Sequence, residues 1–111
     1  MGEAPEDVAI FDDAVLSSLP AERGREISAV REALHDATEP RGEDAVKRTA
    51  VIPRGSPLSD WRLFIRGLVD WLANNTSAAD EAWKRLDPER RPGRIATALM
   101  LALRSDLDVI A

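Results

Sequence analysis

Two stretches of this chain carry one pattern of residues: EDAVKR at residues 43–48 and DEAWKR at residues 80–85. Both consist of two acids, alanine, an apolar residue, lysine and arginine, and the offset between them is 37 residues. Two apolar pairs match at the same offset: Ile27 with Phe64, and Leu34 with Trp71. Self-similarity at a spacing of roughly 20–50 residues is typical of stacked supersecondary units. The pattern therefore predicts two similar units, each made of a long helix, a turn and a shorter helix.

The rest of the chain has the same helical character. Apolar residues recur at three- and four-residue steps, which indicates amphipathic helices, and no segment alternates apolar and polar residues as a strand would. We predict six helices, over residues 7–18, 20–38, 43–51, 59–73, 77–86 and 92–104. The predicted fold class is all-α, with about six helices in stacked antiparallel hairpins. We expect one domain over residues 1–111, with residues 1–6 as a flexible acidic N-terminus.

The pattern also predicts which side chains point inward. The helix over residues 59–73 has an apolar face broader than one stripe, so we expect it to be the central helix. In the helix over residues 43–51, the inward positions are predicted to be Val46 and Ala50. In the first helix, Phe11 is expected among the inward residues.

Composition excludes several classes of function. The 111 residues include no cysteine and one histidine, so a disulfide scaffold, a thiol nucleophile and a cysteine metal cluster are excluded. His35 lies near the end of a predicted helix and has no sequence partner for metal binding or catalysis, so we interpret it as a helix-dipole residue. We expect no catalytic residue, no cofactor and no metal. We also expect no membrane association, because no apolar run approaches the roughly 20 residues of a membrane span.

Charge is unevenly distributed along the chain. The net charge is −5, and residues 1–13 alone carry five acids and no base. Acidity of the whole chain argues against nucleic acid as a partner. Arginine outnumbers lysine 13 to 2, which is typical of a GC-rich genome. Since the acidic start of the chain lacks the basic region of a signal peptide, we expect a cytoplasmic, bacterial protein.

The repeat unit resembles those of the tetratricopeptide-repeat family. The resemblance rests on a hairpin of roughly the family's 34-residue length, on an alanine-rich second helix after a short turn, and on the closing Leu86–Asp87–Pro88. It covers residues 26–104 and implies a right-handed array of antiparallel helix pairs that binds peptides or partner proteins. Trp61 and Gly67 are six residues apart, whereas the family spaces tryptophan and glycine by four, so no peptide-binding residue is carried over.

The candidate partner-binding residues are one tryptophan and five arginines: Trp61, Arg62, Arg66, Arg90, Arg91 and Arg94. Trp61 and Trp71 are ten positions apart and point about 80° from each other on a helix, so they cannot share one narrow seam. We predict that Trp71 and Trp83 lie in the core and leave Trp61 as a candidate rim residue. We expect such anchors in the groove formed by the two long helices.

A basic junction, defined as residues 84–94, has five basic and two acidic residues. Its arginines could bind an acidic or phosphorylated partner, or they could satisfy helix ends and pair with Asp87 and Glu89. The acidic residues 1–13 could lie across this junction, either within the fold or in a neighbouring copy.

The function predicted from the sequence is a non-catalytic protein–protein interaction module, an adaptor, scaffold or assembly subunit. The expected partner is a protein or peptide, with self-association into a homo-oligomer as one form. The alternative is a nucleic-acid-associated or regulatory helical protein that uses the basic junction. A small helical enzyme that uses converging carboxylates and arginine is a further alternative.

Overall fold

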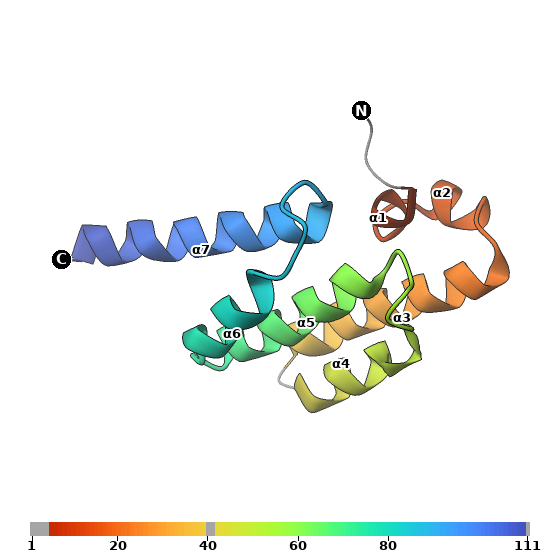
Figure 1. Ribbon diagram of the computed structural model, residues 1–111. Coiled ribbons are helices and arrows are strands. Elements are labelled where there is room, and N and C mark those ends of the chain that lie inside the picture. The colour runs from red at the N-terminus through yellow and green to blue at the C-terminus, as the bar shows by residue number, and fades with distance from the viewer. Residues whose placement is uncertain (1–4, 40–41, 111) are drawn as a thin grey trace.

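The structure is a computed structural model that describes residues 5–39 and 42–110, with side chains described as far as residue 102. Over these residues the chain forms α-helices and one 3₁₀ turn and contains no strand, which confirms the all-α class (Figure 1). The elements are α1 Pro5–Ala9, α2 Asp13–Ser17, α3 Ala21–Thr38, α4 Gly42–Arg48, the 3₁₀ turn η1 Thr49–Val51, α5 Ser59–Leu72, α6 Thr76–Trp83 and α7 Arg91–Ile110.

Two antiparallel hairpins, α3–α4 and α5–α6, form the body of the molecule (Figure 1). Helix α5 packs against α3, α4, α6 and α7, so the prediction of a central helix is confirmed. The offset of 37 residues has structural meaning, because Ile27 of α3 and Phe64 of α5 are both buried. The apolar faces of the two hairpins therefore share one core.

All five aromatic side chains of the sequence lie in one row of ring contacts. Phe11 meets Trp61 with ring centroids 6.1 Å apart, and Trp61 meets Phe64 at 5.8 Å, both edge to face. Phe64 stacks on Trp83 at 5.7 Å, and Trp83 meets Trp71 at 6.3 Å. Offset and edge-to-face aromatic pairs stabilise beyond their buried area, by about 0.5–1.5 kcal/mol each. The row ties the N-terminal segment, α5 and α6 together.

Two glycines allow the shorter helices to approach α5. A Cβ atom at Gly67 would overlap the indole ring of Trp83, whose N–H donates a hydrogen bond to the Phe64 carbonyl at 3.0 Å. A Cβ atom at Gly42 would lie 2.6 Å from Cγ1 of Val69. Side chains at either position would separate the helices, so the absence of a Cβ is a packing requirement here.

The predicted first helix over residues 7–18 is interrupted, and two short helices replace it. Asp12 is extended, and its carboxylate accepts a hydrogen bond from the Ala14 N–H at 2.9 Å, which caps α2. The Arg31 guanidinium of α3 donates to the carbonyls of Ala9 at 2.7 Å and Ile10 at 3.0 Å. The carbonyl groups at the end of α1 thus accept hydrogen bonds from a side chain of α3. The prediction that Phe11 points inward was wrong, since its side chain is 61% exposed.

The predicted N-terminal tail and the predicted first turn need qualification. Of the expected flexible residues 1–6, residues 1–4 lie outside the described part of the chain, and Pro5 and Glu6 form the start of α1. Between the predicted helices over residues 20–38 and 43–51, the turn falls on residues 39–42; of these, residues 40–41 also lie outside the described part, and Gly42 begins α4.

The inward face of α4 differs from the predicted one. Val46 is 40% exposed and Ala50 is also exposed, whereas Ala45, Thr49 and Ile52 are buried. Ala45 and Thr49 are four residues apart and share one face of the helix, and the 3₁₀ turn over Thr49–Val51 brings Ile52, three residues further on, to the same face. The prediction of Val46 and Ala50 as inward residues was therefore wrong.

Helix α7 is longer than predicted and has fewer neighbours than α5. It extends to Ile110 rather than to residue 104, and its main packing partner is α5. In Figure 1 it projects beyond the two hairpins. The molecule measures 49 × 34 × 23 Å along its principal axes.

Candidate functional site

The structure places Trp61 in the core rather than at a rim. Its side chain has no exposed surface, and its indole N–H donates to the Asp7 carboxylate at 2.8 Å. Helix α1 supplies that carboxylate, and Phe11 packs against the same ring. Because α1 covers Trp61, this residue is not accessible to a partner, and its assignment as a partner-binding residue is corrected.

Asp7 is the centre of a polar clamp that sequence analysis did not identify. The side chain is 1% exposed and accepts from Arg90 Nη2 at 2.6 Å and Arg90 Nε at 3.1 Å, and from the Arg91 N–H at 3.3 Å. The hydrogen bond to Asp7 raises the pKa of the Arg90 guanidinium above its ordinary value. The clamp joins α1 to α5 and to the start of α7. The interpretation that the acidic N-terminal segment lies across the basic junction is confirmed at Asp7.

Other residues of the basic junction also interact within the chain. The Arg91 guanidinium lies 5.4 Å from the centre of the Phe11 ring, a cation–π arrangement. Lys84 pairs with Glu81 at 2.8 Å, and this hydrogen bond lowers the pKa of the Glu81 carboxyl and raises the pKa of the Lys84 amine. Arg94 is exposed and also interacts within the chain. Much of the basic charge at residues 84–94 is thus engaged by acids or rings.

Arg62 and Arg66 lie in a different place from Arg90, Arg91 and Arg94. They line a shallow cavity of about 330 Å³ at the contact of α4 and α5, together with Arg54 of the preceding loop. We call this cavity the arginine pocket. The Arg62 guanidinium donates to the Ile52 carbonyl at 3.1 Å, which orients it along the pocket. The six candidate residues therefore separate into a core residue, a pocket pair and a group at the start of α7.

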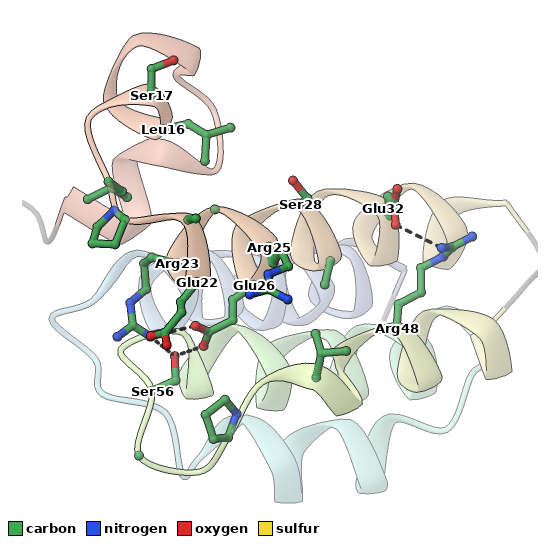
Figure 2. Close-up of a pocket in the computed structure, with 18 residues that line it drawn as sticks. Leu16, Ser17, Glu22, Arg23, Arg25, Glu26, Ser28, Glu32, Arg48 and Ser56 are labelled. Carbon is green, nitrogen blue, oxygen red and sulfur yellow. Dashed lines mark hydrogen bonds and ion pairs between the residues drawn. The ribbon is translucent and has the colours of Figure 1, made fainter.

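The larger cavity is an open groove of about 1060 Å³ along the first half of α3, which we call the α3 groove (Figure 2). Its other walls are the end of α2 with the residues that follow it, Arg48 of α4, and the segment before α5; the lining residues there are Leu16, Ser17, Leu19, Pro20, Arg48, Val51, Pro53, Gly55 and Ser56. The expected groove between the two long helices differs from this one, because α5 contributes no lining residue. The reason is that the facing sides of α3 and α5 are packed against each other in the core.

One end of the α3 groove holds a polar network of Glu26, Ser56 and Arg23 (Figure 2). The Ser56 hydroxyl donates to the Glu26 carboxylate and accepts from Arg23 Nη1 and from the Leu58 N–H, both at 3.1 Å. Arg23 also pairs with Glu26 at 2.8 Å. The hydroxyl proton and both acceptor sites of Ser56 are in use. The network therefore fastens the loop before α5 to α3, and Ser56 has no free lone pair for attack on a substrate.

A second buried acid joins α3 to α4. Asp36 is buried and accepts from Arg48, which also pairs with Glu32 at 3.0 Å. The hydrogen bond from Arg48 to Asp36 raises the pKa of the guanidinium. Asp36 has a weak sequence signal: it lies three residues after Ala33 and seven after Ala29, which are buried on the same side of α3.

His35 is exposed and lies 4.0 Å from Glu39, at the last turn of α3. This position agrees with the interpretation of a dipole residue. Over residues 5–39 and 42–102, no three side chains of the metal-ligating types gather in one place. Nor does any described helix have the length and apolar character needed to cross a bilayer.

The α3 groove and the arginine pocket are the two candidate surfaces that emerge from the geometry. Comparison of the chain with protein-family models, with curated proteins and with solved structures gave no match.

Proposed function

We propose that this chain is a non-catalytic protein–protein interaction module of a bacterial cytoplasm, an adaptor or assembly subunit built from two tetratricopeptide-like hairpins. The observation that supports this most is the α3 groove. Its volume of about 1060 Å³ is at the upper end of small-molecule pockets, and the groove is open along α3. An extended or helical segment of a partner fits such an open groove better than a small molecule, which typically binds in an enclosed pocket.

The lining chemistry of the α3 groove favours a protein segment. Val51 is 63% exposed on one wall, and Leu16 and Leu19 are half-buried on the other. Exposed apolar side chains of this kind gain free energy when a partner removes them from water, about 25 cal/mol per Å². An apolar face that a helical hairpin leaves open is a frequent site of partner binding.

The charged groups of the α3 groove are mostly paired with one another. Arg23 pairs with Glu26, and Arg48 pairs with Glu32. Paired charges at a rim contribute orientation more than affinity. We therefore expect recognition in the α3 groove by shape and apolar contact, with little dependence on the charge of the segment bound there.

The alternative of a nucleic-acid-associated protein depends on the basic junction, where Arg90 binds Asp7 and Lys84 binds Glu81. Phosphate binding there would compete with these carboxylates. Charge engaged in this way weakens the support for that alternative, and we rank it second.

Site-specific crosslinking tests the proposal. A photoreactive benzoylphenylalanine replaces Val51 in the α3 groove or, as the control, the exposed Ala98 of α7, in cells that make the chain natively. We expect one protein, identified by mass spectrometry, to crosslink at position 51 and not at position 98. The same protein, purified, should bind the wild-type chain and lose binding to Ser28→Trp, which fills the groove from its exposed wall. Equal crosslinking at both positions, nucleic acid at position 51, or unchanged binding by Ser28→Trp would contradict the proposal.

A further inference from the structure

The rim of the arginine pocket is unusually basic for this acidic chain. Three arginines line it, Arg54, Arg62 and Arg66, against one acid, Asp60. Arg62 and Arg66 are one helical turn apart on α5, where like charges repel by about 0.2–0.5 kcal/mol. Within the described part of the chain, no carboxylate forms an ion pair with Arg54 or Arg66. The pocket thus concentrates positive charge that the fold does not neutralise.

Two apolar side chains also line the arginine pocket. They are Val46 of α4, which is 40% exposed, and Leu63 of α5, which is half-buried, and we call them its apolar floor. Because Ala45 faces the core, its neighbour Val46 points about 100° away on the helix and lines this pocket. An apolar floor with a basic rim is complementary to a segment that carries both an apolar side chain and carboxylates.

We propose that the arginine pocket binds an acidic segment of a partner protein. One apolar side chain of that segment contacts Val46 and Leu63, and its flanking carboxylates pair with the guanidinium groups of Arg54 and Arg66. Arginine suits this task because its planar fork binds a carboxylate through two parallel hydrogen bonds. This inference rests on the proposed function and names the partner's chemistry at a second surface, separate from the α3 groove.

The acidic N-terminal residues of this chain are less suited to fill the pocket. Asp7 is buried against Arg90, and Asp13 pairs with Arg31 at 2.7 Å. Nucleic acid is also less suited, because the pocket offers three basic groups on a chain of net charge −5. Binding dominated by phosphate contacts typically uses about six to ten of them, and an apolar floor contributes nothing to it.

Binding of defined probes to the full chain tests this inference. The probes are a short fluorescein-labelled peptide of glutamates interspersed with leucines, the same peptide with glutamine for glutamate, and a labelled single-stranded oligonucleotide. The variants are Arg66→Glu in the pocket and Arg85→Glu, which makes the same charge change at an exposed position after α6. A third variant, Val46→Ser, removes apolar contact from the floor. Circular dichroism melting curves of all variants verify that the fold is retained.

We expect the acidic peptide to bind the wild-type chain, with Arg66→Glu weakening it by about tenfold or more and Arg85→Glu by less than about twofold. Val46→Ser should weaken binding by a few-fold, and the glutamine peptide should bind poorly. The inference is overturned if the acidic peptide fails to bind, if both charge reversals have equal effects, or if the oligonucleotide binds more tightly than the peptide. Crosslinking at position 51 reports on the α3 groove independently, so a failure here leaves the proposed function to its own test.

Discussion

At the scale of single residues, buried carboxylates connect elements that are distant in sequence. Burial of a charge costs several kcal/mol unless it is paired and hydrogen-bonded. Asp7 meets this condition with donors from Trp61, Arg90 and Arg91. Removing one partner of a buried pair is therefore more destabilising than replacing both partners by apolar residues. The reason is that the group that remains is left buried without its hydrogen-bond partner.

Replacement of Asp7 by alanine tests the clamp. We expect Asp7→Ala to lower the free energy of unfolding by about 2–3 kcal/mol, below the range for fully buried pairs because Arg90 retains some exposure to water. Asp13→Ala is the matched control, since the Asp13 side chain is 87% exposed and its ion pair should contribute less than about 1 kcal/mol. Urea denaturation measures both. A double-mutant cycle with Arg90→Ala should show coupling, and strictly additive effects would contradict the clamp.

At the scale of elements, α5 organises the fold because its neighbours approach it closely. Helix α6 lies against α5 at Gly67, where the missing side chain leaves room for the Trp83 indole. The start of α4 lies against Val69 of α5 because Gly42 has no side chain there. Glycine in a helix interior costs about 1 kcal/mol relative to alanine. The fold accepts this cost at Gly67 because a closer α6 places Trp83 in the aromatic row.

Two glycine-to-alanine substitutions should therefore have opposite effects. Gly67→Ala should destabilise by about 1–3 kcal/mol, because the rigid indole must move and its hydrogen bond to the Phe64 carbonyl must break. Gly24→Ala in α3 should stabilise by about 0.5–1 kcal/mol, because a Cβ there meets only Leu16 at 3.9 Å. Thermal or urea unfolding gives both values. Stabilisation by Gly67→Ala would mean that α6 does not lie as described.

At the scale of the whole molecule, two hairpins form a shared core, and the two terminal segments that pack on it meet each other at Asp7. Helix α5 has four packed neighbours, whereas α7 packs mainly on α5, and α1 reaches α7 through the bonds of Asp7 to Arg90 and Arg91. Regions with few packed neighbours open at lower free energy than the core does. The clamp should make two distant segments open together.

Native-state hydrogen exchange tests this coupling. We expect the amides of α1 and of the first turn of α7 to share one opening free energy and one denaturant dependence, both lower than those of α5. The physical reason is that the bonds of Asp7 to Arg90 and Arg91 join the two segments, so the opening of either one removes a contact of the other. Independent opening of α1, with the start of α7 as slowly exchanging as α5, would contradict the coupling.

The helical class, the central helix predicted over residues 59–73 and the repeated hairpin could be predicted from the sequence, because they follow from local periodicity and turn residues. The sequence also singled out Arg62 and Arg66, which line one pocket. The break between α1 and α2, the inward face of α4 and the burial of Trp61 could not be predicted from the sequence and became clear from the three-dimensional structure. Each of these features depends on a contact between residues that are distant in sequence: Arg31 binds the end of α1, the core packs against one face of α4, and Asp7 binds Trp61. Such contacts leave no periodic pattern in the sequence.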